Sequence, residues 1–151
     1  MDFFKKGINK VKDKVSKADL EKKLAEATTN ETGFANISLL NEISSRTDDS
    51  ECCKIIVNYC MKILSLKPKF WKRILKALNL IEHVIKTGSQ NFVDQIKDER
   101  DRLRELYNFS YEDEDKDRGE QSKSIHFKRL YIIIIIFIFY YTSKRESKIY
   151  F

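Results

Sequence analysis

The sequence predicts an all-α fold, and three observations support that class. The chain has 151 residues with only four glycines and one proline, which leaves little material for the turns of a β-sheet. Apolar residues recur at intervals of three and four along consecutive segments, which is the spacing of one helix face. The polar stretches between those segments are short, which favours a compact helical stack over an extended coil. A chain of this length forms one domain that buries about two-thirds of its unfolded surface.

Residues 1–16 carry an amphipathic pattern. On a helix, four apolar side chains fall within an arc of about 60°, with lysines on both sides; they are Phe4, Ile8, Val11 and Val15. Because the segment is short and contains Gly7, it is at best marginally helical in water, and we predict that an anionic lipid surface orders it. Alternatively, the apolar stripe packs on the protein's own core, as in most amphipathic helices.

Two helices follow in the first third of the chain. Ser16 and Asp19 form a capping-box pattern, which predicts a new helix from there to about Thr28. Residues 29–33 are polar and form a loop. The next helix covers about residues 38–47, where leucines and an isoleucine lie on one side.

Three further helices follow. Asp49 or Ser50 caps a helix that runs to about residue 66, and Pro68 ends it. Residues 70–87 form the central helix, described next. Ser89 can cap the last predicted helix, which continues with or without a break to Leu106.

The central helix carries the strongest signal. Pro68 suits the start of a helix and Gly88 the position just past its end. Apolar residues cover most of the circumference beyond the first turn, so the helix lies in the core. Its start is basic, with no acid before Glu82: the bases are Lys67, Lys69, Lys72, Arg73 and Lys76. Because the helix dipole is also positive there, this end suits a polyanion, phosphate above all.

Charge is distributed unevenly along the chain, whose net charge is +6. Residues 52–81 hold seven bases and no acid, whereas residues 94–120 hold eleven acids and six bases, which predicts one positive face. The three cysteines make a poor disulfide framework, and no secretory signal precedes them, so we predict a reducing, cytoplasmic environment.

Several functions are excluded by the motifs that they require. An aspartate-rich stretch begins like a calcium loop, but Arg118 stands where glycine is needed and Ser124 where glutamate is needed. His83 has no nucleophile or carboxylate partner placed by a motif, so we predict no enzyme, metal site or cofactor. No recognition helix or RNA-binding signature is present, so nucleic acid is not an expected partner.

Four ordered blocks give the chain a family resemblance. Residues 23–31 (KLAEATTNE) match a K-V-R-E-A-T-x-N-D motif in part, and residues 39–47 match L-x-x-E-I-x-x-x-T. Residues 71–89 match W-R-x-V-x-K-A-L-x-L-x-x-Y-L-I-K-x-G-S with few changes, and residues 109–119 retain F-x-Y-x-D-x-x-G-K-D-x-G in outline. The chain therefore resembles epsin N-terminal homology (ENTH) domains over about residues 1–119.

This resemblance implies a superhelical stack of about seven helices, of the ENTH/VHS type, with a lipid-ordered N-terminal helix. It also implies a phosphoinositide-binding adaptor module in clathrin-linked vesicle traffic, on the cytoplasmic surface of the plasma membrane, endosomes or Golgi-derived vesicles. Phosphoinositide lipids and the clathrin adaptor machinery are the implied partners. The implied headgroup residues are Lys5, Lys6, Lys10, Lys12, Asn30, Lys69 and Arg73, and the membrane-inserting residues are Phe4, Ile8, Val11 and Val15.

Departures from the motifs weaken this expected site. Ala25 and Ile63 stand where the family usually places headgroup-binding bases, and Lys22 and Lys23 are candidates to compensate for the first. Losing a charge-assisted contact typically costs about 1.5 to 3 kcal/mol, so we expect weaker or altered headgroup selectivity. The family's Pro-Trp-Gly turn is also replaced, and we predict that Phe34 fills the aromatic pocket.

The tail fits the family least. We divide the chain into an amphipathic helix (1–16), an ENTH-like domain (17–119) without its last helical layer, and a hydrophobic low-complexity tail (120–151). The apolar run at residues 130–141 is shorter than the roughly 17 to 25 residues of a membrane-spanning helix. Its five consecutive isoleucines suggest translated non-coding sequence or, if the tail is genuine, either a hydrophobic cover or an aggregation-prone strand. The alternative function is a VHS-like protein-interaction domain without lipid-induced folding.

Overall fold

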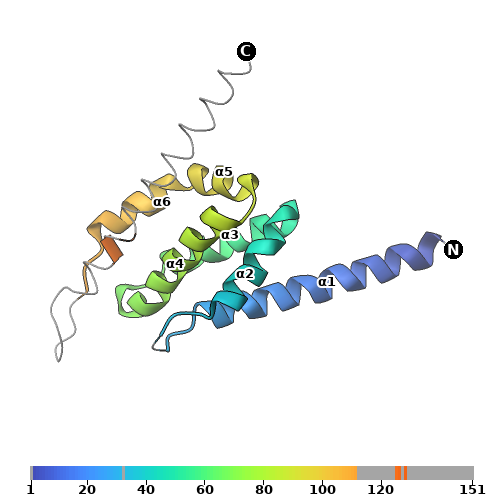
Figure 1. Ribbon diagram of the computed structural model, residues 1–151, viewed down its shortest axis with the longest axis horizontal. Helices are drawn as coiled ribbons and strands as arrows, with labels where there is room; N and C mark the ends of the chain where they lie inside the picture. Colours follow the sequence, from blue (N-terminus) through green and yellow to red (C-terminus); the bar gives the residue numbers. More distant parts are fainter. Residues whose placement is uncertain (1, 32, 112–124, 127, 129–151) are drawn as a thin grey trace, which may run out of the picture.

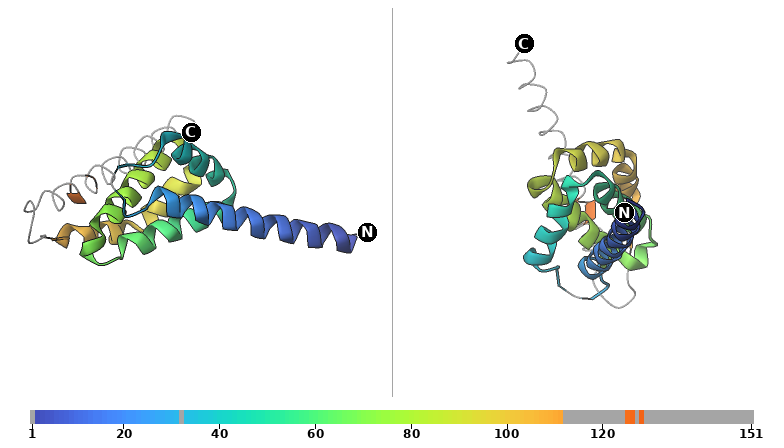
Figure 2. Two further views of the ribbon diagram at one scale, coloured as in Figure 1. Left: turned by 90° about the horizontal axis from the view of Figure 1, so that it is seen from below. Right: turned by 90° about the vertical axis from the view of Figure 1, so that its right-hand side faces the viewer.

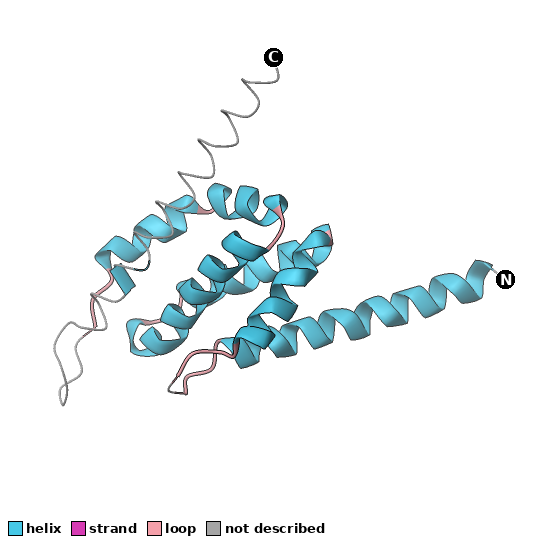
Figure 3. Ribbon diagram, viewed as in Figure 1, coloured by secondary structure: helices cyan, strands magenta, loops and turns pink. Residues whose placement is uncertain are grey.

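The computed structural model describes residues 2–31, 33–111, 125, 126 and 128, and every regular element in this part of the chain is helical (Figure 3). The α-helices are α1 (Asp2–Ala27), α2 (Ile37–Ser45), α3 (Ser50–Leu64), α4 (Trp71–Thr87), α5 (Gln90–Asp98) and α6 (Arg100–Glu105). Short 3-10 turns link them: η1 (Arg46–Asp48), η2 (Pro68–Phe70) and η3 (Leu106–Asn108). The predicted all-α class is confirmed.

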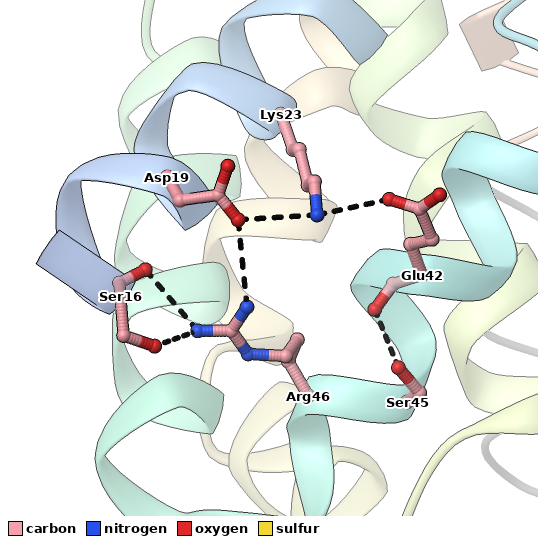
Figure 4. A network of polar contacts seen from close by, with 6 residues as sticks. All are labelled: Ser16, Asp19, Lys23, Glu42, Ser45 and Arg46. Atoms are coloured by element: carbon pink, nitrogen blue, oxygen red, sulfur yellow. Dashed lines mark hydrogen bonds and ion pairs between the residues drawn. The ribbon is translucent and has the colours of Figure 1, made fainter. Parts of the chain in front are cut away.

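The first helix is longer than predicted. α1 runs without a break through Ser16, so the helix start predicted there is wrong. The guanidinium of Arg46 donates to the carbonyl oxygen of Ser16 at 3.1 Å and to its hydroxyl (Figure 4). The Asp19 carboxylate pairs with Lys23 at 3.1 Å and with Arg46 at 3.7 Å. Because both capping groups are engaged in these contacts, they do not form a capping box.

The N-terminal half of α1 projects beyond the other helices, whereas its C-terminal half packs against α2, α3 and α4 (Figures 1 and 2). Leu20 and Leu24, in the packed half, are fully buried. Gly7, in the projecting half, is exposed. The helix therefore joins a docked segment to one that extends away from the domain.

α4 is the central helix, as predicted, and packs against α2, α3 and α5. Its fully buried side chains are Ile74, Ala77, Leu78, Leu80, Ile81 and Val84. Gly88 ends it by donating its N–H to the carbonyl oxygen of Val84 at 2.7 Å. A Cβ at Gly88 would lie 2.7 Å from that oxygen and 2.9 Å from the Thr47 hydroxyl, so the close approach requires glycine.

The caps of the other helices are partly as predicted. Asp49 caps α3 by accepting from the N–H of Glu51 at 2.9 Å. Ser89 stands at the N-cap position of α5, as predicted, but its side chain makes no capping hydrogen bond. Its hydroxyl instead donates to the carbonyl oxygen of Thr47 at 2.8 Å, and its N–H donates to the Thr47 hydroxyl at 2.9 Å. The Ser89 side chain thus joins two elements of the core.

Three residues beyond the 109–119 motif pack against the domain. Ile125 is fully buried, and the imidazole Nε2 of His126 lies 2.8 Å from the carbonyl oxygen of Phe109. Lys128 forms an ion pair with Glu82 of α4. Burial alone would raise the pKa of the Glu82 carboxyl, but the ammonium groups of Lys128 and Lys86 bring that pKa below its ordinary value. This part of the segment therefore contributes to the core.

The three cysteines are free and buried, as expected of small core residues. Burial raises the pKa of the Cys60 thiol to about 12. None of the helices in the described ranges is long and apolar enough to cross a membrane. The apolar run at residues 130–141, with the predictions made for it, lies outside the described residues.

Candidate functional site

Two cations of α4 hold the loop that follows α1 through hydrogen bonds. Arg73 donates its Nε–H to the carbonyl oxygen of Thr28 at 3.0 Å. Lys76 donates from Nζ to the Thr29 hydroxyl at 3.1 Å and to the carbonyl oxygen of Glu31 at 2.7 Å. The first turns of α4 therefore fix residues 28–31, although more than forty residues of sequence separate the two segments.

Lys76 has a structural role that the sequence did not reveal. Its side chain is only 7% exposed, and its hydrogen-bond acceptors are neutral oxygens. Burial lowers the pKa of its ammonium group, and nearby Lys72 adds to this effect, while Glu31 opposes it. The basic cluster of the sequence thus contains one buried cation, Lys76, that holds the loop, while Arg73 also contacts the loop but stays partly exposed and the other bases are exposed or partly exposed.

The solvent-facing cations lie at the start of α4. Lys69, in η2, is exposed, and its Nζ lies 5.1 Å from the centre of the Phe70 ring. The Nζ of Lys72 lies 5.8 Å from the centre of the Trp71 ring. Within the described residues, no ion pair joins Lys69, Lys72 or Arg73 to a carboxylate. These charges are available to an anionic ligand.

Three predicted headgroup residues gather around this end of α4. Asn30 is exposed in the loop and lies two residues after Thr28, which accepts the Arg73 bond. Arg73 is partly exposed, and Lys69 precedes it by four residues. The start of α4 is also the positive end of its helix dipole, which adds to the positive potential there. We call Asn30, Lys69 and Arg73 the loop–helix site.

The straight α1 does not bring the predicted N-terminal lysines to the loop–helix site. With a rise of 1.5 Å per residue, Lys12 lies about 24 Å and Lys5 about 35 Å along the helix axis from Thr28. Lys6 and Lys10 lie between these limits. The backbone of Phe4, Ile8, Val11 and Val15 is helical, and the predicted ordering of this segment by lipid stays a prediction. The side chains of all eight residues lie outside what the structure describes.

The positions that depart from the family motifs differ in their surroundings. Ile63 is buried in α3, whereas Ala25 is exposed on α1. Lys23 does not compensate for Ala25, because its ammonium group pairs with Glu42 at 2.9 Å and with Asp19 at 3.1 Å (Figure 4). Hydrogen bonds to Glu42 and then Asp19 raise the pKa of Lys23. Lys22 is exposed and remains a candidate.

Phe34 does not fill an aromatic pocket, so that prediction is wrong. Its side chain is 62% exposed at the edge of a cavity of about 190 Å³. The other lining residues are Glu31, Gly33, Trp71, Lys72, Leu75 and Lys76. Gly33 has a φ of 93°, a left-handed conformation that redirects the chain just before Phe34. The phenyl ring therefore lines the mouth of the cavity and faces solvent.

Comparison with known proteins identifies similar sequences and folds. The ENTH domain profile matches residues 17–136 and so extends past residue 119, where the motifs end. An epsin from Dictyostelium discoideum is 30% identical over 118 residues, which are 78% of this chain and 17% of that protein. The chain therefore spans less than a fifth of that relative.

Solved ENTH structures share the fold. The human epsinR ENTH domain is 27% identical, with a TM-score of 0.67, covering 75% of this chain and 85% of that one. The epsin-2 ENTH domain, solved in complex with phosphatidylinositol 4,5-bisphosphate, is 22% identical with a TM-score of 0.72. That match covers 78% of this chain and 81% of the other, and it bears on the fold alone.

Proposed function

The chain belongs to the ENTH domain family, and on this premise we propose that it is the phosphoinositide-binding module of a membrane adaptor. The observation that supports this best is the loop–helix site, where Lys69 and Arg73 have no carboxylate partner among the described residues. Clathrin-linked traffic is the proposed setting, with the module peripheral to the cytoplasmic leaflet.

The loop–helix site has the chemistry of an inositol phosphate receptor. Lys69 offers a compact charge, and Arg73 offers a planar guanidinium, of which the Thr28 bond uses one N–H. The exposed amide of Asn30 can donate to a phosphate or ring hydroxyl. Because Arg73 and Lys76 already fix the loop, a headgroup meets donors that need little further ordering.

The projecting half of α1 is the proposed second membrane contact. Its stripe of Phe4, Ile8, Val11 and Val15 enters the leaflet, while Lys5, Lys6, Lys10 and Lys12 bind anionic headgroups. The lysines reach the loop–helix site only if α1 bends between residue 12 and its docked half, since the straight helix keeps them about 24 Å or more away.

Vesicle sedimentation tests the proposal. Wild-type protein should pellet with phosphatidylcholine vesicles that contain phosphatidylinositol 4,5-bisphosphate, and Lys69→Glu should weaken this binding about tenfold or more. Lys54→Glu, at an exposed position of α3, makes the same change in net charge and should have a much smaller effect. Equal losses of vesicle binding in both variants would mean that only overall charge matters. The assignment of the loop–helix site would then be wrong.

The alternative of a protein-interaction domain predicts a different result. Such a domain would neither pellet with these vesicles nor gain helicity from them. Phe4→Ser separates the two membrane contacts, because it removes an apolar group far from the loop–helix site. If Phe4→Ser and Lys69→Glu each weaken binding, both contacts contribute.

A further inference from the structure

Two large apolar side chains face solvent near the loop–helix site. Among the residues whose exposure the structure describes, the exposed large hydrophobic side chains are Phe34, at 62%, and Ile37, at 67%. Phe34 lies in the loop that carries Asn30, and Ile37 is the first residue of α2. Because the other large apolar side chains whose exposure the structure describes are buried or partly buried, this pair is a distinct local feature of the described surface.

Two cavities lie beside this pair, and apolar side chains line part of each. Phe34 lines the 190 Å³ cavity together with Trp71 and Leu75. On its other side, Phe34 and Ile37 line a second cavity of about 280 Å³, where Ala35 and Leu40 add further apolar surface. The two cavities therefore place exposed and partly exposed apolar side chains from the start of α4 to the start of α2.

Cations border this surface. Lys72 lines the first cavity beside the Trp71 ring, and Lys86 lines the second. Two acids also lie there. Glu31 lines the first cavity, and Glu82, in the second, is paired with Lys86 and Lys128. Exposed aromatic and aliphatic side chains bordered by lysines are the composition that favours the interface of an anionic leaflet.

We infer that Phe34 and Ile37 insert into the leaflet that presents the headgroup bound at the loop–helix site, which makes the end of this loop a membrane contact separate from α1. The inference rests on the proposed function. Asn30 lies only four residues before Phe34, so a lipid whose headgroup contacts Asn30 brings the bilayer surface within reach of the Phe34 ring. Continuity with the headgroup site therefore favours a lipid leaflet over a protein as the partner.

Binding measurements on the double variant Phe34→Ser/Ile37→Ser test this inference. Binding to vesicles containing phosphatidylinositol 4,5-bisphosphate should weaken by roughly tenfold or more, since two partly buried apolar groups are lost. Binding of soluble inositol 1,4,5-trisphosphate, measured by calorimetry, should stay unchanged. Asn91→Ser, at an exposed position of α5, is the control and should leave both affinities unchanged.

A fluorescent label locates the insertion directly. Because the native cysteines are buried, Phe34→Cys can be labelled selectively with an environment-sensitive dye. On the same vesicles, its emission should shift to the blue and be quenched by nitroxide-labelled lipids. The same dye at Asn91→Cys should not respond, because it lies in α5, on the opposite side of the domain from the loop (Figure 1).

Each other outcome overturns the inference. If vesicles bind the double variant normally and the dye does not shift, insertion is wrong, while the proposed function stands. If the double variant also loses the binding of inositol trisphosphate, Phe34 and Ile37 hold the loop in place and do not enter lipid. If wild type is a dimer in solution and the double variant a monomer, the pair is a subunit interface. If wild type binds no vesicles at all, the proposed function fails, and this inference fails with it.

Discussion

Replacing Lys76 with methionine tests whether α4 holds the 28–31 loop in place. The change removes two hydrogen bonds from a buried ammonium group, at 3.1 and 2.7 Å. Hydrogen bonds from charged donors contribute about 1.5 to 3 kcal/mol each. The burial that lowers the pKa of Lys76 offsets part of that gain. Because methionine keeps most of the aliphatic volume, we expect the free energy of unfolding to fall by about 1 to 3 kcal/mol.

Urea denaturation followed by circular dichroism measures this difference. Lys72→Met is the matched control, because it removes the same group from the same helix, where the ammonium lies over the Trp71 ring. A partly exposed cation–π pair contributes about 0.5 to 1 kcal/mol, so the control should lose less. Equal stability of wild type and Lys76→Met would refute the role assigned to Lys76. So would a control that loses as much as Lys76→Met.

A comparison of wild type with Lys76→Met also gives a prediction for alkaline pH. Folding lowers the pKa of Lys76 below its ordinary value of 10.5, so the folded state disfavours the protonated amine. Between the lowered pKa and 10.5, the unfolded chain binds more protons at this position, and the contribution of Lys76 to stability therefore rises with pH. The stability of wild type minus that of Lys76→Met should increase over this range. A difference that falls with pH would contradict the assigned burial.

Three further predictions concern separate parts of the chain. Gly88→Ala should lower the melting temperature, because its Cβ would lie 2.7 Å from the Val84 carbonyl oxygen, and overpacking of this kind costs about 1 to 3 kcal/mol; an unchanged melting temperature would refute the close approach. The Cys60 thiol, whose pKa is about 12, should react with a thiol reagent at neutral pH only after unfolding, and rapid modification of the native protein would contradict its burial. Circular dichroism should show more helix with phosphoinositide vesicles than without them, and Phe4→Ser should reduce the gain; equal helicity in both conditions would rule out a lipid-ordered N-terminus.

Local sequence signals predicted the central helix because its determinants are local. The apolar spacing of α4 and the glycine at its end act within a few residues of one another. The same holds for the Asp49 cap of α3, whose acceptor and donor are two residues apart. The helical class followed from these patterns and did not require any long-range contact.

The errors share a different cause. Ser16 and Ser89 both have the residue type of a helix cap, but each is engaged by a partner more than twenty-five residues away: Arg46 for the first, Thr47 for the second. The sequence placed Lys76 among the bases that suit a polyanion, whereas in the structure it is buried against the loop of residues 28–31. Phe34 looked like a pocket residue because only its residue type was visible, whereas its direction depends on the backbone at Gly33. Tertiary contacts and backbone geometry determine the roles of these residues, and the local sequence predicts neither.

A distance measurement tests whether α1 stays straight or bends when the protein binds vesicles. Gly7 lies about 30 Å along the helix axis from Ala27, so a straight α1 keeps the N-terminal lysines away from the loop–helix site. Spin labels at Gly7→Cys and Lys67→Cys report this separation, and both positions are exposed. If the lysines share the headgroup with Arg73, the distance must shorten by roughly 10 Å or more on vesicles, because a helix of this length reaches the site only by bending. A distance that stays long while the protein is bound would mean that α1 engages other lipids, and the two basic segments would then act on separate headgroups.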